Sequence, residues 1–225
     1  MITSEFLNFL YEFSQNNNRE WFDKNKKRFE GTVKKPFEQF VAAVIRRIQA
    51  FEPQFQITPK ESIFRIYRDT RFSNDKTPYK THMAAVFTAQ GRKTTEEWVY
   101  PGYYLQISYG SLNLGGGAYF LDKEMLTKVR QAIAQDPAGF HRAIDNPNFT
   151  GKYGALRGER NKILSPEFKS AALHEPLLYQ KQFYFMAELD PGRVLEPDSV
   201  EFIGQYFEAA KPVNAFFRQA VGSAV

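Results

Sequence analysis

The residues best suited to chemistry in this sequence are concentrated between positions 65 and 82. They combine cations with one acid, one phenol and one imidazole: Arg65, Arg68, Asp69, Arg71, Lys76, Tyr79, Lys80 and His82. A guanidinium can donate two parallel hydrogen bonds to a phosphate or carboxylate, and a lysine adds a point charge. Asp69 can hold one guanidinium in place while the others bind an incoming anion. This segment therefore predicts a binding site for a phosphorylated or otherwise anionic ligand.

Two other interpretations of the same residues stay open. In an enzyme acting on a phosphate ester or a nucleic acid, Asp69 would be a base or metal ligand, and His82 a proton donor or acceptor. No second carboxylate stands at metal-ligand spacing from Asp69, so this hypothesis ranks below binding. In a structural or partner-binding protein, the ion pairs would only lock a loop, with Arg68 buried beside a partner. The residue types support the binding and the structural interpretations about equally.

The positive charge of the chain is also concentrated in this segment. The chain has 225 residues and a formal net charge of +5. Residues 60–82 contain six Lys and Arg against three Asp and Glu, whereas residues 186–225 contain three against six. A local excess of positive charge favours polyanions, so the expected partner is a phosphorylated small molecule or a nucleic acid.

Several function classes are excluded or unsupported. The absence of cysteine excludes disulfides, thiolate nucleophiles and iron–sulfur clusters. The three histidines, His82, His141 and His174, are far apart, so we predict no metal site, and no cofactor is indicated. No phosphate-binding loop, dinucleotide fingerprint or nucleophile elbow occurs. No apolar run approaches about 20 residues, and the first residues do not resemble a signal peptide. We therefore expect a cytoplasmic protein without a membrane segment.

The elements that position this segment follow from periodicity. Helical spacing of apolar residues predicts N-terminal helices, one capped by Asn18 and a third running from about Pro36 toward Pro53. Strands are expected over 83–90, 103–109, 112–120 and 182–189, and a helix capped by Asp122 between the third and fourth of them. Residues 147–180 are expected to be loop-rich. A long C-terminal helix would begin with a capping box at Asp198–Glu201 and kink or break at Pro212. The chain is thus predicted to be one α+β domain over 1–225, a mixed or antiparallel central sheet flanked by N-terminal and C-terminal helices.

Two local questions concern the backbone near the candidate site. As a strand, residues 64–72 would place Arg65, Asp69 and Arg71 on one face, whereas a helix would separate Arg71 from Arg65. We favour a strand to about Tyr67 followed by an ordered loop held by Pro78. The run Gly115-Gly116-Gly117 could offer amides to an anion, or it could form a bulge or a tight strand-to-helix crossing where side chains would clash, and the structural explanation is favoured.

The sequence from Arg65 to His82 resembles a known family at every specified position. It fits the pattern RxxRDxRFxxxKxPYKxH, which is typical of the conserved hypothetical bacterial proteins called domain of unknown function 2461. Asn17-Asn18-Arg19-Glu20-Trp21-Phe22, the glycine run and Arg130-Gln131-Ala132-Ile133 are also similar to that family. The chain departs from it within 157–182, where Ala172-Leu173-His174-Glu175-Pro176 replaces the usual Asp-His-Pro. The resemblance implies a single-domain bacterial protein without assigned activity, whose residues Arg65, Arg68, Asp69, Arg71, Lys76, Pro78, Tyr79 and Lys80 act as a unit.

Overall fold

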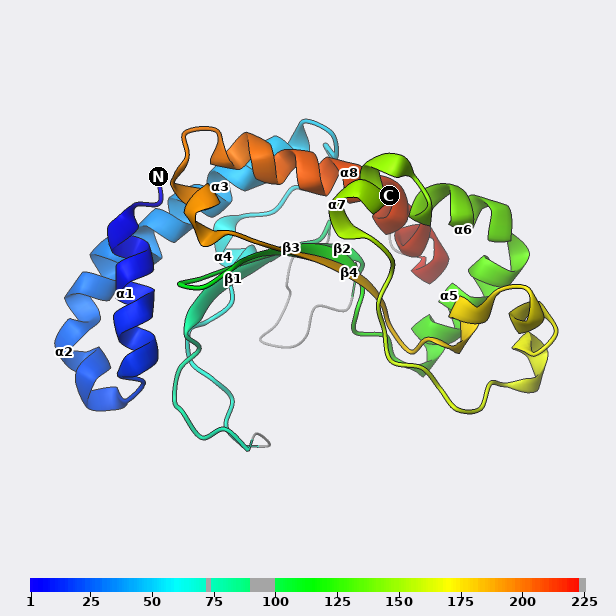
Figure 1. Ribbon diagram of the computed structural model, residues 1–225, viewed down its shortest axis with the longest axis horizontal. Helices are drawn as coiled ribbons and strands as arrows, with labels where there is room; N and C mark the ends of the chain where they lie inside the picture. Colours follow the sequence, from blue (N-terminus) through cyan, green and yellow to red (C-terminus); the bar gives the residue numbers. More distant parts are fainter. Residues whose placement is uncertain (72–73, 90–99, 223–225) are drawn as a thin grey trace.

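A curved antiparallel sheet lies at the centre of the computed structural model, which describes residues 1–71, 74–89 and 100–222 (Figure 1). Its four strands are adjacent in chain order: β1 (His82–Phe87), β2 (Gly102–Ser108), β3 (Leu112–Ala118) and β4 (Phe183–Leu189). Helices α3 and α8 cover the convex face, and other helices stand at both ends of the sheet. The predicted α+β fold with flanking N-terminal and C-terminal helices is confirmed, and the sheet is antiparallel throughout the described residues.

The N-terminal helices follow the predicted periodicity with one addition. Helices α1 (Ser4–Gln15) and α2 (Arg19–Phe29) pack side by side, and the Asn18 side chain accepts a hydrogen bond from the backbone of Trp21, as expected of the cap. Helix α2 continues through a π-helical turn, η1 (Glu30–Lys34), into α3 (Lys35–Gln49). A short helix, α4 (Pro59–Ser62), then leads into residues 65–82, here called the motif.

The register of the sheet separates a covered face from an open one. Along β2, Tyr103, Leu105 and Ile107 are fully buried, whereas Tyr104 and Gln106 are only half-buried, as the predicted period of two requires. Tyr103 and Phe87 contact Phe207 of α8, so their face is the convex one. The alternate residues of all four strands therefore face the concave side.

The three consecutive glycines lie within β3, and the strand continues through them in unbroken register, so they form neither the expected bulge nor a strand-to-helix crossing. A Cβ at Gly116 would lie 2.2 Å from the carbonyl oxygen of Gly102, so only glycine fits there. Gly117 has a φ of 97°, and its N–H donates to the buried side chain of Asn214. The clash of side chains that the structural explanation assumed is therefore with the neighbouring strands.

Helix α8 (Ser199–Val221) runs along the convex face beside α3 and β3. It is one helix through Pro212, so of the two expected outcomes, a kink or a break, the break does not occur. The capping box is also wrong, because Asp198 makes no capping hydrogen bond and instead forms an ion pair with Arg193, 3.1 Å between Nη1 and Oδ1. An arginine partner offers that carboxylate a charge-assisted hydrogen bond, which competes with the cap.

The end of the sheet opposite α1 and α2 carries a second group of helices. Helix α5 (Lys123–Gln135) begins at the predicted cap, where Asp122 accepts from the backbone of Met125, and α6 (Pro137–Ile144) follows directly. Within the stretch expected to be loop-rich, the structure has α7 (Pro147–Tyr153) and three 3₁₀ turns, η2 (Pro166–Phe168), η3 (Ala171–Leu173) and η4 (Pro176–Tyr179). Another such turn, η5 (Pro191–Leu195), joins β4 to α8. Among the described residues, no helix combines the length and apolar composition needed to cross a membrane.

Candidate functional site

The motif segment is extended and lies beside the first strand. The backbone N–H of Phe64 donates to Ala84 of β1, and Tyr67 forms an isolated antiparallel bridge with Tyr79. The segment is held by such single bridges, so the predicted strand through Tyr67 does not form as a regular strand. The predicted alternation nevertheless holds, because Arg65, Tyr67, Asp69 and Arg71 are exposed while Ile66 is buried.

Tyr79 belongs to the core rather than to a binding surface. It is 3% exposed, and its ring lies 4.4 Å from that of Phe22 and 5.4 Å from that of Phe13. Burial raises the pKa of its hydroxyl. The Asn17 side chain accepts from the Tyr79 N–H and donates to its C=O, at 3.2 and 2.9 Å. The structure therefore gives Tyr79 a packing role in place of the expected ligand contact.

The remaining loop residues pair with one another. Arg68 forms an ion pair with Asp75, 2.6 Å between Nη1 and Oδ2, and its buried Nε has no partner. Asp75 also accepts from the backbone and hydroxyl of Thr77, which, with the Arg68 charge, holds the pKa of this carboxyl below its usual range. Lys76 donates to the C=O of Thr70 at 2.9 Å. Such ion pairs and hydrogen bonds within one loop are what the structural interpretation of these residues predicts.

Asp69 and Arg71 form an exposed pair at the same loop. Arg71 donates to both carboxylate oxygens, with Nη2 at 2.7 Å from Oδ2, while the two side chains remain 76% and 42% exposed. The guanidinium of Arg71 lowers the pKa of Asp69 and Asp69 raises that of Arg71. Asp69 thus orients Arg71, as the sequence suggests, and neither residue lines either of the two cavities described next.

The first cavity, here called the Arg65 cavity, has a volume of about 640 Å³. Its apolar wall comes from α2, the segment after α4 and β1: Phe22, Phe29, Ile63, Ile66 and Met83. Four cations also line it: Lys26, Lys34, Lys60 and Arg65. Lys34 pairs with Glu30 at 3.0 Å, and Glu38 is the other acid at the cavity. Of the ion pairs between described residues, none involves Lys26, Lys60 or Arg65.

The second cavity, here called the sheet cavity, has a volume of about 410 Å³ and lies on the concave face. Lys80 and His82 come to it from the motif, and the rest of the lining from the sheet and its flanks: Phe64, Ala84, Tyr104, Gln106, Gly116, Tyr119, Phe120, Tyr184 and Met186. Burial, together with the charges of Lys80 and Arg68, lowers the pKa of His82 to about 4. Its imidazole is therefore neutral at pH 7.

The structure thus distributes the eight predicted site residues over four places instead of one. Arg65 lines the first cavity, Lys80 and His82 line the second, and Tyr79 is in the core. Of the other four, Arg68 pairs with Asp75, Asp69 pairs with Arg71, and Lys76 binds the loop backbone. Sequence reasoning missed Lys26, Lys60, Tyr104 and Gln106. The two lysines carried a signal, because residues 23–35 contain six Lys and Arg against two acids.

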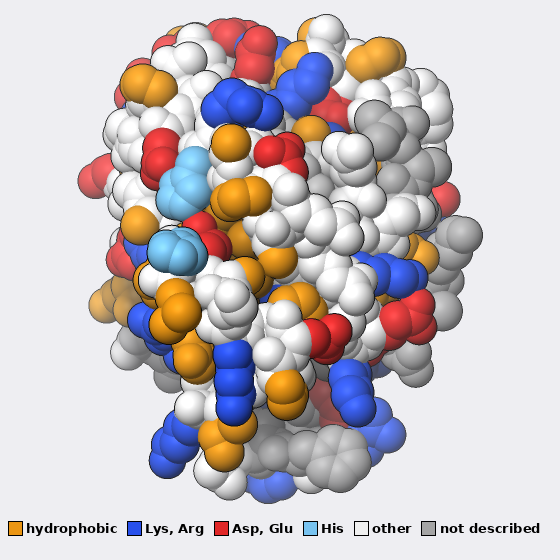
Figure 2. Space-filling view, turned by 90° about the vertical axis from the view of Figure 1, so that its right-hand side faces the viewer, with side chains coloured by type: hydrophobic (Ala, Val, Ile, Leu, Met, Phe, Trp, Pro, Cys, Tyr) orange, Lys and Arg blue, Asp and Glu red, His pale blue; other side chains and the backbone are white. Residues whose placement is uncertain are grey.

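A second cluster of titratable side chains lies at the opposite end of the molecule. His141 of α6 lies between two carboxylates, with Nδ1 at 2.8 Å from Asp145 and Nε2 at 2.7 Å from the buried Glu175. Glu175 is the N-cap residue of η4, so this contact joins α6 to the 3₁₀ turns. Figure 2 shows acidic and basic side chains interspersed over this end, with no single basic patch on the part described. In the described ranges, no group of three or more potential ligands could hold a metal ion.

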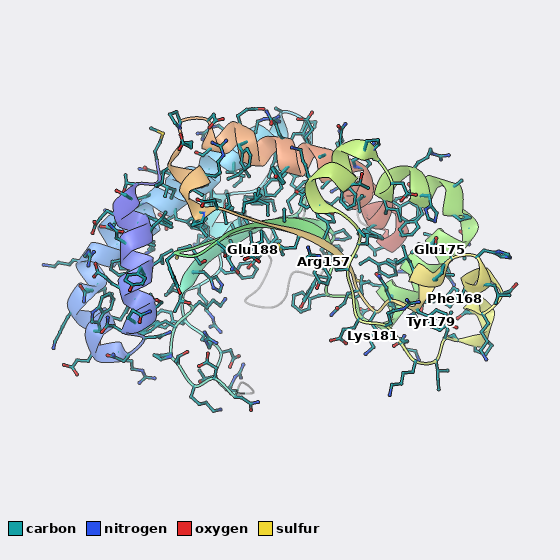
Figure 3. The ribbon with its side chains drawn as sticks, viewed as in Figure 1. Arg157, Phe168, Glu175, Tyr179, Lys181 and Glu188 are labelled. Carbon is teal, nitrogen blue, oxygen red and sulfur yellow. The ribbon has the colours of Figure 1, made fainter. Side chains whose placement is uncertain are left out.

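The concave face is bounded on this side by the segment before β4. Figure 3 shows Arg157 and Lys181 on the chain that descends from the sheet opposite α1 and α2. Arg157 donates to the C=O of Met186, 2.9 Å, and Lys181 pairs with Glu159 at 3.3 Å. Both cationic side chains therefore already bind neighbouring groups of the protein.

Comparison with known proteins identifies one relationship. A family model described as conserved hypothetical protein (DUF2461) matches residues 5–216. No curated protein and no solved structure matches the chain.

Proposed function

The chain belongs to the DUF2461 family of conserved hypothetical proteins, and we propose that it binds a small phosphorylated or otherwise anionic ligand with an apolar part in the Arg65 cavity. One observation carries this proposal: three cations that form no ion pair with a described carboxylate, Lys26, Lys60 and Arg65, line a cavity with an apolar wall. Unpaired cations at a cavity favour an anion, and the phenylalanines favour an apolar group attached to it. Among the predicted motif residues, Arg65 is the one that would bind the ligand here.

The two acids at this cavity do not cancel the positive charge. Glu30 is occupied by Lys34, which leaves Glu38 against three cations. Each charge-assisted hydrogen bond contributes about 1.5–3 kcal/mol, so losing Arg65 should weaken binding roughly tenfold or more.

The test uses 1-naphthyl phosphate as the probe, with inorganic phosphate and 1-naphthol as its two halves. At about 100 times its dissociation constant, the probe should stabilise the protein by roughly 2.7 kcal/mol, which corresponds to a melting-temperature increase of about 5–10 °C. Arg65→Gln should reduce this shift strongly. Arg71→Gln is the matched control, because Arg71 is a motif arginine that lines neither cavity and should leave the shift unchanged.

Failure takes two forms in this experiment. If the probe does not stabilise the wild type, or if both variants reduce the shift equally, then the Arg65 cavity is not the anion site. Stabilisation by inorganic phosphate alone at the same concentration would show that the apolar wall makes no contribution.

A nucleic acid is the second candidate ligand, favoured by a continuation of the basic surface. A depression beside the Arg65 cavity shares Lys26 and Glu30 with it and adds Asp23 and three lysines. Two of these lysines, Lys27 and Lys35, form no ion pair in the described parts of the chain. An oligonucleotide bound there would lose affinity steeply with salt, with a log–log slope of about −0.7 for each phosphate contacted on a single strand. A salt-independent affinity would exclude this candidate.

A further inference from the structure

The sheet cavity differs in chemistry from the Arg65 cavity. Aromatic rings from three segments enclose it: Phe64 from the motif, Tyr119 and Phe120 after β3, and Tyr184 from β4. Tyr119 meets Tyr184 edge to face, with ring centroids 5.1 Å apart. Its volume of about 410 Å³ falls within the range of roughly 300–1,000 Å³ found for small-molecule sites.

The floor of the cavity is low because the sheet carries small residues there. Ala84 contributes little bulk, and Gly115, which lies on the same face as Tyr104, lets the Met186 side chain lie close to the sheet. A Cβ at Gly115 would be only 2.7 Å from the Met186 sulfur. A floor of small residues and a polarisable thioether, bordered by aromatic rings, suits a planar ring better than a branched ligand.

Two neutral polar groups supply hydrogen bonds at this floor. Gln106 accepts from the Tyr104 hydroxyl at 2.8 Å through Oε1, and its Nε2 has no partner among the described residues. His82 is half-buried, and in the described part of the chain no group forms a hydrogen bond with its ring. A neutral imidazole offers one donor and one acceptor. Because His82 pairs with Ser108, it is a diagonal neighbour of Gln106, close enough for one ligand to reach both.

Lys80 brings a cationic side chain to the same cavity. Its ammonium lies 5.1 Å from the centre of the Phe64 ring, which also lines the sheet cavity.

From these contacts we propose that the sheet cavity binds a planar nitrogen heterocycle of the nucleobase class, with the ring between the aromatic walls and its polar edge on Gln106 and His82. This site is separate from the Arg65 cavity, although Phe64 lines both. It requires no phosphate, so a nucleoside without phosphate is sufficient for recognition. The proposal therefore stands or falls independently of the proposed anion site.

The experiment measures binding of adenosine, guanosine, cytidine and uridine by isothermal titration calorimetry at pH 7.5. At least one of them should bind with a dissociation constant below about 1 mM. Gln106→Leu and His82→Leu should each weaken that binding at least fivefold. Gln205→Leu, on the exposed side of α8, is the matched control, and Arg65→Gln should leave nucleoside affinity unchanged.

Two variants are used so that misfolding of one does not decide the result, and circular dichroism identifies the folded ones. Absence of binding by all four nucleosides would overturn the proposal. So would binding that survives in whichever of Gln106→Leu and His82→Leu is folded. Loss of nucleoside binding in Arg65→Gln but not in the sheet-cavity variants would place the ring in the other cavity and equally overturn it.

Discussion

His82 shows how strongly the environment of one residue changes its chemistry. The sequence suggests a titratable group that could exchange protons near neutral pH. In the structure, burial and the nearby cations Lys80 and Arg68 lower its pKa to about 4. The imidazole is therefore a neutral hydrogen-bonding group at pH 7 rather than a proton shuttle. Asp69, the other residue that the enzyme hypothesis invokes, lies outside the sheet cavity.

The shift of the His82 pKa predicts a specific pH dependence of stability. A histidine in the unfolded chain has a pKa of about 6.5. Between about pH 6.5 and 4, therefore, only the unfolded state binds this proton. The free energy of unfolding should therefore fall as the pH falls through this window, by up to about 1.4 kcal/mol per pH unit from this one proton. Above it, both states are neutral and His82 contributes no slope.

Urea unfolding at pH 7, 6 and 5 measures this effect. His82→Gln should make the decrease in unfolding free energy shallower than in the wild type. The exposed His174 supplies the control, because His174→Gln should follow the wild type. Identical pH slopes for His82→Gln and the wild type would contradict the proposed burial of a neutral imidazole.

Among the elements, the junction of α1, α2 and the motif depends on one asparagine. Asn17 connects the turn between the two helices to both backbone groups of Tyr79, which lies 62 positions later. The rings of Phe13 and Phe22 complete the contact. Asn17 thus holds the part of the motif around Tyr79 against α2, the helix that supplies Lys26 to the Arg65 cavity.

Asn17→Ala should lower the free energy of unfolding by about 1–3 kcal/mol, because a backbone N–H and C=O lose their partners in a largely apolar setting. Chemical denaturation checks this value. Asn148→Ala is the control, since that asparagine is exposed and its side chain makes no hydrogen bond within the described residues. A change of less than about 0.5 kcal/mol in Asn17→Ala would show that aromatic packing alone holds the junction.

For the molecule as a whole, one buried ion pair joins its two ends across the convex face. Arg218 of α8 donates to both oxygens of Glu52, which follows α3, at 2.9 and 2.7 Å, and both side chains are about 1% exposed. The Tyr103 hydroxyl of β2 also donates to Glu52. The N-terminal helices, the sheet and the C-terminal helix therefore meet at one charged centre.

Glu52→Leu should destabilise the protein by about 3–5 kcal/mol, because Arg218 would remain buried without a counter-charge. Combining it with Arg218→Met should recover most of that loss, since an apolar pair of similar volume needs no desolvated charge. Urea denaturation of both variants provides the measurement. An exposed pair, Lys24 with Glu20, is the comparison: Lys24→Met should change stability by no more than about 0.5 kcal/mol. A double variant as unstable as Glu52→Leu would mean that the network has a role beyond charge compensation.

The amino-acid sequence alone determined the elements and the location of the unusual segment. Apolar spacing is a local property, so it correctly predicted α1, α3, the alternation of β2 and the caps at Asn18 and Asp122. It was also sufficient for the alternation of exposed and buried residues from Arg65 to Arg71. It failed at Asp198, where an ion pair replaced the cap, and for α7, whose short helix carries no clear apolar period.

Only the tertiary structure decided which motif residues share a surface. Neighbours in an extended segment point to opposite sides, so adjacent motif positions need not act together. Lys26 lines the same cavity as Arg65 only because α2 packs against the motif, and His82 lines the same cavity as Tyr184 only because all four strands form one sheet. Whether a charged or titratable group is buried, paired or open to a ligand depends on residues tens to hundreds of positions away. No local pattern contains that information.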